Sequence, residues 1–288
     1  MCSANDQLNY ATYANTDSTF TVSQEQQLEY QQQGVIVLRD VISEYWLDKL
    51  AHAIERDIAN PGPFYHGYNP KDGKGKFHGN LRIWEHDEAF KAYCFDSVLP
   101  SIAAQLMESE KINLLYDQLF VKEPNTLNAT RWHSDQPYWP IQGEQILSFW
   151  LCLDPVSQQN GALEFVKGSH LWNRWFQPES FGEGSGAEYD KNEQFEPMID
   201  IENNRDKYDI ASWDLKPGDL YVVQGMTVHG AKGNSTADGR RRGYTVRYIG
   251  DDIRYDIRKG LSKPICNPNF KQGDKLCGEQ YPQVFPHQ

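Results

Sequence analysis

Residues 114–122 read LLYDQLFVK and mark the point where the residue pattern changes from one typical of helices to one typical of strands. After this stretch come short runs rich in β-branched and aromatic residues, at residues 146–153, 162–166, 220–223 and 244–249, separated by Gly, Pro, Asn and Asp. Several short strands with regular turn signals are typical of a β-sandwich or β-barrel. The sequence therefore predicts a mainly β domain.

The residues before this point predict helices that flank the sheet. Ser23 with Gln26 three positions on is a capping-box pattern that opens a helix over residues 24–33, and Gly34 stands at the expected C-cap. A short strand over residues 35–38 follows. The N-terminal part thus begins with one helix leading directly into the sheet.

A second helix is predicted after Ser43, because apolar residues recur at three- and four-residue spacing: Trp46, Leu47, Leu50, Ala53 and Ile54. Residues 60–80 contain Gly, Pro and aromatic residues without either period, so we expect an ordered loop there. A third helix is expected near residues 88–108. The apolar face of the second helix requires a partner, most simply the predicted sheet.

Composition limits the class of protein. The 288 residues are 39% hydrophobic and 24% charged, which is a globular composition. No run of about 18 apolar residues and no signal-peptide pattern is visible, so we predict a cytoplasmic protein with no membrane association. The net charge of −12 disfavours binding to nucleic acid. Five cysteines without a CxxC pair indicate reduced thiols rather than disulfides or a cysteine zinc site.

The most informative motif is RWHSDQ at residues 131–136. If these residues form a strand, His133 and Asp135 point to the same face, because the side-chain period of a strand is two. An imidazole and a carboxylate would then meet one ion. Taken alone, an HxD triplet is weak evidence, since a surface pair gives the same pattern.

A second histidine, His229, follows ninety-six residues after His133, and the run Arg240, Arg241, Arg242 opens another predicted strand. Two histidines and one carboxylate with open positions form the facial triad of non-haem Fe(II) oxygenases. An arginine one strand away supplies the planar fork that pairs with a carboxylate of a dicarboxylate co-substrate. Strand alternation turns at least one of the three arginines inward.

Several pieces in order resemble the phytanoyl-CoA dioxygenase-like family of Fe(II)/2-oxoglutarate oxygenases, over residues 23–252. The pieces are QLFVKEP at 118–124, WHSDQ at 132–136 with YWP at 138–140, WLCLD at 150–154, NGAL at 160–163 with KGSH at 167–170, and GD at 218–219 leading to HG at 229–230, NS at 234–235 and the arginine run. Each piece is generic, and their order is specific.

The resemblance implies a double-stranded β-helix, that is, a jelly-roll or cupin-like barrel with the metal near one mouth. It implies Fe(II) as the metal, with His133, Asp135 and His229 as its ligands, and 2-oxoglutarate and O2 as co-substrates. It also implies that an arginine at the start of the strand after the second histidine binds the far carboxylate of 2-oxoglutarate.

Two arginines compete for this role. Counting from His229 favours Arg240, whereas aligning the strand favours Arg241. We prefer Arg241, because strand register fixes the face that a side chain takes, while the preceding loop can absorb one residue. Further co-substrate contacts suggested by the family are Gln118 and Lys122, which share a strand face, and Trp150.

The remaining histidines and cysteines have simpler interpretations. His170 in the GSH turn is expected to make a structural hydrogen bond, and His52, His86 and His287 to lie at the surface. His66 and His78 flank a loop that could face substrate. Cys266 and Cys277 are expected to be free thiols.

The predicted organisation is one jelly-roll domain over residues 23–288, preceded by a loose arm at residues 1–22. Residues 172–213, which we call the flap, form an insertion too long for an ordinary connection. Within residues 179–209 ten acidic and three basic residues supply seven of the twelve net negative charges. The flap is interpreted either as a lid or as a solubilising loop. Residues 254–288, the C-terminal extension, are expected to pack along the barrel.

The sequence predicts a dioxygenase that hydroxylates an unactivated C–H bond of a small-molecule metabolite. Desaturation or ring closure at the same site, and a non-catalytic cupin-like binding protein, remain alternatives. Halogenation is disfavoured because halogenases of this fold replace the carboxylate ligand, which is present here as Asp135. The acidic flap and overall charge argue weakly against an acyl-CoA substrate. The substrate itself and the oligomeric state are not predicted.

Overall fold

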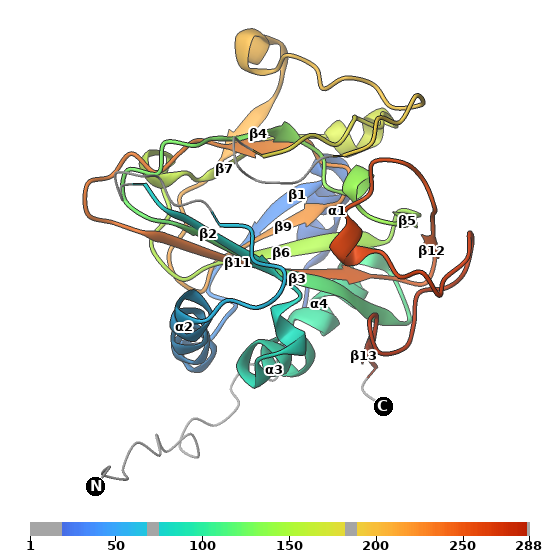
Figure 1. Cartoon of the computed structure of the whole chain (residues 1–288), viewed down its shortest axis with the longest axis horizontal. Coiled ribbons are helices and arrows are strands. Elements are labelled where there is room, and N and C mark those ends of the chain that lie inside the picture. Colours follow the sequence, from blue (N-terminus) through green and yellow to red (C-terminus); the bar gives the residue numbers. More distant parts are fainter. Residues whose placement is uncertain (1–18, 68–74, 182–188, 287–288) are drawn as a thin grey trace, which may run out of the picture.

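The computed structural model describes residues 19–67, 75–181 and 189–286. Two antiparallel sheets that face each other form the centre of the described chain (Figure 1). The large sheet has the order β1 (Val35–Leu38), β9 (Leu220–Gln224), β6 (Ile146–Cys152), β11 (Arg241–Ile249), β3 (Ile112–Lys122), β13 (Gln283–Phe285), with β2 (Phe77–Leu81) also on β3. The small sheet has the order β4 (Thr130–His133), β10 (His229–Ala231), β7 (Leu163–Val166), β8 (Ile210–Ser212).

Four helices pack on the face of the large sheet that points away from the small sheet (Figure 1). They are α1 (Gln24–Gln33), α2 (Glu44–Ala59), α3 (Glu88–Asp96) and α4 (Leu99–Met107). Their apolar side chains form one core with the outward-facing residues of the sheet. The prediction of a mainly β domain with flanking helices is confirmed.

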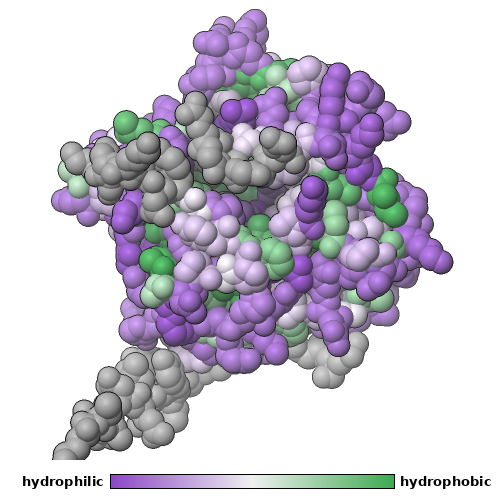
Figure 2. Space-filling view, in the orientation of Figure 1, coloured by the Kyte–Doolittle hydropathy of each residue, from purple (hydrophilic) through white to green (hydrophobic). Residues whose placement is uncertain are grey.

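Polar residues cover much of the molecular face shown in Figure 2, with small apolar patches among them.

The predicted helix starts are correct in position but differ in detail. Ser23 and Gln26 form the expected capping box, and Gly34 ends α1 with a φ of 73°, a conformation that favours glycine. Ser43 precedes α2 but makes no capping hydrogen bond with its side chain. Trp46, Leu50, Ala53 and Ile54 are buried as the periodicity predicts, whereas Leu47 is only partly buried.

Two predictions about local structure are wrong. The single helix expected near residues 88–108 is divided into α3 and α4, because Ser97 is extended with a ψ of 175° and Pro100 follows at the start of the next helix. Residues 60–80 are not entirely a loop, because their last residues form β2, which pairs with β3 along its whole length. The glycine and aromatic residues there show no strand periodicity, and the partner strand is distant in sequence, so the strand was not predicted.

The C-terminal extension packs against the end of the barrel, as predicted. Its strand β12 (Arg254–Tyr255) pairs with β5 (Ile141–Gln142), and β13 joins the edge of the large sheet. Tyr255, Ile265 and Tyr281 belong to a buried cluster with Trp139 and Tyr116 of the barrel. The boundaries predicted for the extension, the flap and the domain stay predictions, and most of the expected N-terminal arm lies outside the described residues.

Within the described ranges, no helix is long and apolar enough to cross a bilayer. The four cysteines there, Cys94, Cys152, Cys266 and Cys277, are all free thiols, in agreement with the sequence prediction. Cys2 lies outside the described residues.

A buried carboxyl group lies beneath the helices, on the outer face of the large sheet. Asp117 of β3 is fully buried, and its Oδ2 atom accepts hydrogen bonds from the Tyr244 hydroxyl at 2.6 Å and the Trp84 backbone N–H at 3.1 Å. Its Oδ1 atom has no hydrogen-bond partner among the described residues. Burial raises the pKa of Asp117 to about 7. The folded chain therefore retains the Asp117 proton over a pH range in which the unfolded chain releases it.

We expect Asp117→Asn to change how stability depends on pH. Because the folded-state pKa is raised, the stability contributed by the Asp117 proton is fully present below about pH 4 and is lost as the pH rises through about 7. The free energy of unfolding of the wild type should fall relative to that of Asp117→Asn by about 1.4 kcal/mol per pH unit in this range. Urea unfolding at several pH values measures this difference, and the exposed Asp96→Asn is the control. If the difference in free energy of unfolding between wild type and Asp117→Asn stays constant from about pH 4.5 to about pH 7.5, the assignment is contradicted.

Candidate metal centre and co-substrate pocket

Two histidines face each other across neighbouring strands of the small sheet. His133 ends β4 and His229 begins β10, and the two residues are directly paired in the antiparallel ladder. Their ring centroids are 4.3 Å apart, and the residues are only 8% and 9% exposed. Cross-strand pairing thus brings together two side chains that are far apart in the sequence.

Asp135 joins these histidines, although not by the predicted route. The strand ends at His133, and Asp135 has α-helical backbone angles at the start of the turn η3 (Gln136–Tyr138). The expectation that His133 and Asp135 share one face of a strand is therefore wrong. The turn that follows β4, anchored by the Gln136 N–H on the Gly225 carbonyl at 2.9 Å, brings the carboxylate back to the His133 ring. The Asp135 Oδ1 atom is 3.4 Å from His133 Nε2.

Both imidazoles are oriented by backbone carbonyl groups. The Nδ1 atom of His133 lies 2.8 Å from the Arg131 carbonyl oxygen, and Nδ1 of His229 lies 2.9 Å from that of Thr227. A carbonyl can only accept, so each Nδ1 donates, and each Nε2 atom is left as a lone-pair donor for a metal. One ligand atom from each of His133, Asp135 and His229 lies within 4.8 Å of the others, and this is the one group of three such side chains in the described part of the chain.

The electrostatics of the three residues suit a metal ion. Burial and the neighbouring His133 lower the pKa of His229 to about 4, so its imidazole is neutral at neutral pH. Burial alone would raise the pKa of Asp135, but the nearby charge of Arg247 brings that pKa below its usual range. Two imidazoles and one carboxylate are the ligand set that suits Fe(II) with open positions. The donor atoms therefore fit the predicted metal.

These three residues line a cavity with a volume of about 690 Å³ between the two sheets. Its wall includes every residue predicted to contact 2-oxoglutarate except Arg240, that is, Gln118, Lys122, Trp150 and Arg241. It also includes His66 but not His78. The structure thus brings the predicted metal ligands and the predicted co-substrate contacts into one space.

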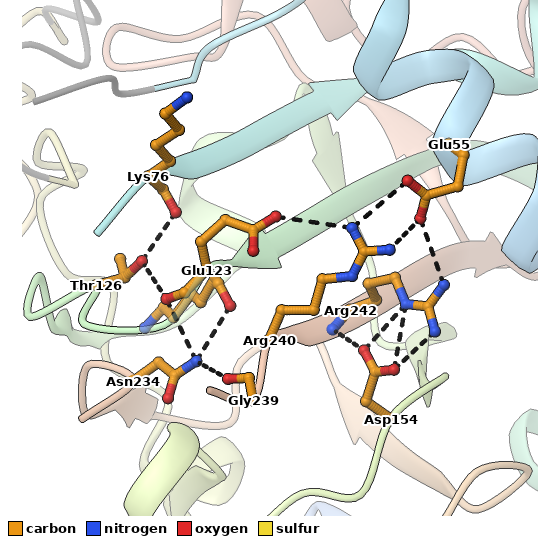
Figure 3. Close-up of polar contacts among 10 residues, drawn as sticks. Glu55, Lys76, Glu123, Thr126, Asp154, Asn234, Gly239, Arg240 and Arg242 are labelled. Atoms are coloured by element: carbon orange, nitrogen blue, oxygen red, sulfur yellow. Dashed lines mark hydrogen bonds and ion pairs between the residues drawn. The ribbon is translucent and has the colours of Figure 1, made fainter. Parts of the chain in front are cut away.

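Strand register places the two arginines in different surroundings. Arg241 pairs with Lys122 across β11 and β3, is 2% exposed, and lines the cavity. Arg240 points the other way and forms ion pairs with Glu55 and Glu123, as Figure 3 shows. Arg242 is paired with Asp154 in the same view. Only Arg241 of the three is available to a ligand in the cavity.

Arg241 is an arginine without an acidic partner. No hydrogen bond or ion pair to its guanidinium is formed by the described residues, and its contact is a cation–π interaction with the Trp150 ring at 5.3 Å. Burial lowers its pKa to about 10, so it remains charged at neutral pH. A buried, charged and unpaired guanidinium is costly unless an anion completes it. Its surroundings therefore fit a carboxylate such as that of 2-oxoglutarate.

The other predicted contacts lie beside Arg241. Gln118 and Trp150 are both paired with Thr245 on β11, from the two neighbouring strands. The Lys122 ammonium donates to the Lys232 carbonyl at 2.8 Å, and burial followed by the charge of Arg241 lowers its pKa well below the ordinary value. These positions agree with the sequence prediction. Their roles stay predictions.

Sequence reasoning missed Arg247, which lies two residues beyond Thr245 and therefore on the same face of β11. Its guanidinium Nη2 is 3.6 Å from Asp135 Oδ2. The signal was present, because the alternation that turns Arg241 inward also turns Gly243, Thr245 and Arg247 inward. Residues 261–265 of the C-terminal extension also line the cavity. No periodicity in their sequence could have revealed this.

The remaining histidines have separate structural roles. His78 Nε2 is 2.7 Å from the Asp57 carboxylate, and His78 does not line the cavity. His66 does line the cavity, with its Nε2 atom 3.3 Å from Gln118 Nε2. His170 Nε2 donates to the Gln31 carbonyl oxygen at 3.0 Å, in agreement with the predicted structural hydrogen bond. His287 lies outside the described residues.

Comparison with known proteins agrees with this geometry. The family model described as phytanoyl-CoA dioxygenase matches residues 30–243. A multifunctional dioxygenase, prhA of Penicillium brasilianum, is 27% identical over 189 residues, which cover 58% of this chain and 56% of that protein. The chain thus matches little more than half the length of such relatives.

Solved structures share the fold. The α-ketoglutarate-dependent carbocyclase SnoK from nogalamycin biosynthesis is 22% identical, with a TM-score of 0.71, and the match covers 91% of this chain and 96% of that one. EctD from S. alaskensis, solved with 2-oxoglutarate and 5-hydroxyectoine, is 20% identical with a TM-score of 0.68, covering 90% and 88%. These similarities confirm the predicted jelly-roll fold.

Proposed function

We propose that this chain, which belongs to the phytanoyl-CoA dioxygenase family of Fe(II)- and 2-oxoglutarate-dependent oxygenases, hydroxylates an unactivated C–H bond of a small-molecule substrate, with succinate and CO2 as co-products. The observation that carries the proposal is the convergence of two unlike features in one cavity. One is the group formed by His133, Asp135 and His229, and the other is the buried, unpaired Arg241. A metal and a dicarboxylate are the ligands that these two features suit.

In this proposal His133, Asp135 and His229 hold the iron, and Arg241 holds the far carboxylate of 2-oxoglutarate. Iron with 2-oxoglutarate and O2 supplies the oxidising power that breaks the C–H bond. The backbone carbonyls of Arg131 and Thr227 keep the two Nε2 atoms directed at the metal. The protein therefore contributes ligand orientation, co-substrate orientation and the exclusion of water.

The cavity has room for a substrate beside the co-substrate. Its volume of about 690 Å³ is in the range of sites that bury a drug-sized molecule. Aromatic side chains supply much of the wall near the metal ligands, among them Tyr138, Trp139, Phe181 and Tyr189. A substrate with an apolar framework stacked on these rings fits this wall.

The described ends of the flap close the metal side of this cavity. Phe181 lies edge-on to the His133 ring with centroids 4.6 Å apart, and it stacks on Tyr138 at 5.3 Å. Trp175 and Phe195 stack on each other above Arg258 of the C-terminal extension. These contacts support the lid interpretation of the flap over the solubilising one. The middle of the flap, residues 182–188, lies outside the described residues.

We expect Phe181→Ala to loosen the closure without removing a ligand. Loss of the ring that covers His133 admits water to the metal side of the cavity, so consumption of 2-oxoglutarate without substrate should rise several-fold relative to the coupled rate. Succinate formed in the absence of substrate measures this. Leu171→Ala, a change at a residue that is 66% exposed just before the flap, is the control. Equal substrate-free succinate formation in both variants would favour the solubilising interpretation.

The test of the proposed function is a screen of metabolites for stimulated 2-oxoglutarate turnover. Iron-dependent succinate formation separates an enzyme from a cupin-like binding protein, which would hold a ligand without producing succinate. The mass of the product separates the reactions, since hydroxylation adds one oxygen atom whereas desaturation or ring closure removes two hydrogen atoms. Succinate formation that does not depend on iron would refute the proposal.

A further inference from the structure

Two prolines limit the hydrogen bonds within the segment that carries Asp135. After Asp135 the chain passes through the turn η3, which contains Pro137, and then through Pro140, and neither proline has an N–H group to donate. The Asp135 carboxylate lies 3.4 Å from His133 Nε2, which is longer than the roughly 2.7–2.9 Å of a strong charge-assisted hydrogen bond. The position of this carboxylate therefore depends on how the backbone of the turn is held.

Arg258 of the C-terminal extension supplies donors to this backbone. Its guanidinium donates to the carbonyl oxygens of Gln136 at 2.9 Å, Trp139 at 2.5 Å and Ile141 at 3.2 Å. It also forms an ion pair with Asp256, and its side chain is only 10% exposed. A planar guanidinium presents several N–H groups in a fixed geometry, so one side chain can serve several acceptors. Arg258 thus fixes the turn from outside the cavity wall that the described residues form.

Two aromatic residues of the flap cover the same guanidinium. The Cζ atom of Arg258 lies 4.9 Å from the ring centroid of Trp175 and 5.8 Å from that of Phe195. The two rings stack on each other with centroids 5.4 Å apart. The Glu196 N–H donates to the Trp175 carbonyl at 2.8 Å, which ties the two flap segments together. Cation–π contacts strengthen as water is removed, so this pair holds the buried guanidinium in one orientation.

The flap and the C-terminal extension also meet at the two residues after Arg258. The Asn192 side chain donates to the Lys259 carbonyl at 3.4 Å. Gly260 follows with a φ of 87°, and a Cβ atom there would lie 3.2 Å from the Asp190 carbonyl oxygen and 3.5 Å from Pro178. The flap therefore packs on the extension along a continuous stretch of backbone.

This route from the flap to the metal ligands differs from the Phe181 contact. Phe181 covers the His133 ring inside the cavity. Trp175 and Phe195 lie outside the cavity wall of the described residues and reach Asp135 only through Arg258 and the turn. An effect of these two rings on the metal would therefore have to pass through the guanidinium.

Resting on the metal site of the function proposed above, we propose that Arg258 is a positioning residue for the iron ligand Asp135, and that the Trp175–Phe195 pair couples the flap to the metal through it. Packing of the pair restricts the guanidinium, and the guanidinium restricts the turn. A flap docked on Arg258 therefore strengthens Fe(II) binding. Because coupling between two equilibria is reciprocal, Fe(II) in turn stabilises the docked flap.

The first measurement is the Fe(II) affinity of the full-length, metal-free protein by anaerobic calorimetric titration. Arg258→Met should weaken Fe(II) by about 10- to 100-fold, the usual cost of losing a residue that orients a metal ligand. Arg258→Lys keeps a cation beneath the rings but loses the planar fork, so its affinity should be intermediate. Trp175→Leu should weaken Fe(II) by about fivefold or more, although Trp175 lies outside the cavity wall of the described residues.

Arg174→Met is the matched control. Like Arg258, Arg174 lies over an aromatic ring of the flap, that of Phe176 at 5.0 Å, and pairs with a carboxylate, that of Glu196. Its side-chain hydrogen bonds within the described residues all go to Glu196 and none to the turn. The Fe(II) affinity of Arg174→Met should stay within about twofold of the wild-type value, as expected for loss of an exposed ion pair.

The second measurement is hydrogen exchange of flap amides with and without Fe(II), again without O2. The N–H groups of Gln177 and Glu196 report on the docked flap, because they donate between its two segments, to the carbonyls of Glu196 at 2.7 Å and Trp175 at 2.8 Å. Fe(II) should slow their exchange in the wild type but not in Arg258→Met at saturating Fe(II). A residue that only stabilised the fold would leave this Fe(II)-dependent difference intact.

The inference is overturned if Arg258→Met binds Fe(II) as tightly as Arg174→Met does, or if Fe(II) leaves flap exchange unchanged in the wild type. A lower free energy of unfolding of metal-free Arg258→Met, together with unchanged Fe(II) affinity, would show a structural role alone. If Arg258→Met does not fold, Arg258→Lys and Trp175→Leu decide the matter by the same two measurements. Wild-type protein that does not bind Fe(II) would refute the proposed function instead.

Discussion

Replacing Asp135 with alanine should abolish tight Fe(II) binding and leave the fold intact. The Asp135 carboxylate is the single anionic donor of the three-residue group, and loss of an outer-shell partner alone typically costs 10- to 100-fold in metal affinity. Removal of a direct ligand should therefore weaken Fe(II) by more than about 100-fold. His133→Ala and His229→Ala should have similar effects, since each leaves two donors against competing water. Turnover should fall to background in all three variants.

Anaerobic calorimetric titration of the metal-free protein with Fe(II) measures this effect, and circular dichroism reports the fold. Asp209→Ala is the matched control, because Asp209 is an exposed carboxylate of the flap and pairs with Lys167. The control should bind Fe(II) as the wild type does. Wild-type Fe(II) affinity in Asp135→Ala would show that the metal assignment is wrong.

Arg241→Ala should raise the requirement for 2-oxoglutarate by one to two orders of magnitude. A charge-assisted pair with a carboxylate contributes about 1.5–3 kcal/mol, and the buried position of Arg241 leaves no nearby cation to replace it except Lys122, which already donates to a carbonyl. Fe(II) affinity should change little. The apparent KM for 2-oxoglutarate, and its dissociation constant in the absence of O2, both measure the effect.

Arg240→Ala is the matched control for this prediction. It removes the same charge one residue away, but from a side chain paired with Glu55 outside the cavity (Figure 3). We expect less than a threefold change, roughly the scale of a surface ion pair. A larger defect in Arg240→Ala than in Arg241→Ala would mean that the count from His229, and not the strand register, identifies the co-substrate arginine.

Local patterns in the sequence predicted the parts of the fold that depend on local chemistry. The capping box at Ser23 and the left-handed Gly34 define α1 through contacts within a few residues. The strand at residues 77–81 was missed because its stability comes from pairing with β3, about forty residues later. Period-two alternation placed Arg241 correctly, because a strand fixes side-chain faces without reference to distant segments.

The sequence identified most residues of the candidate site, but not how the backbone brings them together. His133 and His229 meet because they are cross-strand partners, which no spacing between them specifies. Asp135 reaches them through a turn, not along the strand. Arg247 was within reach of the same alternation argument that found Arg241, whereas the contribution of residues 261–265 depends entirely on how the C-terminal extension packs.

The C-terminal extension has two tasks carried by separate residues. Arg258 donates to the backbone carbonyls of Gln136 at 2.9 Å and Trp139 at 2.5 Å, and so buttresses the turn that carries Asp135. A few residues later, residues 261–265 form part of the cavity wall. Substrate preference can therefore diverge through exchange of a five-residue patch, while the neighbouring arginine preserves the metal geometry. Substitutions that alter substrate preference can accumulate in this segment without rearranging the metal ligands.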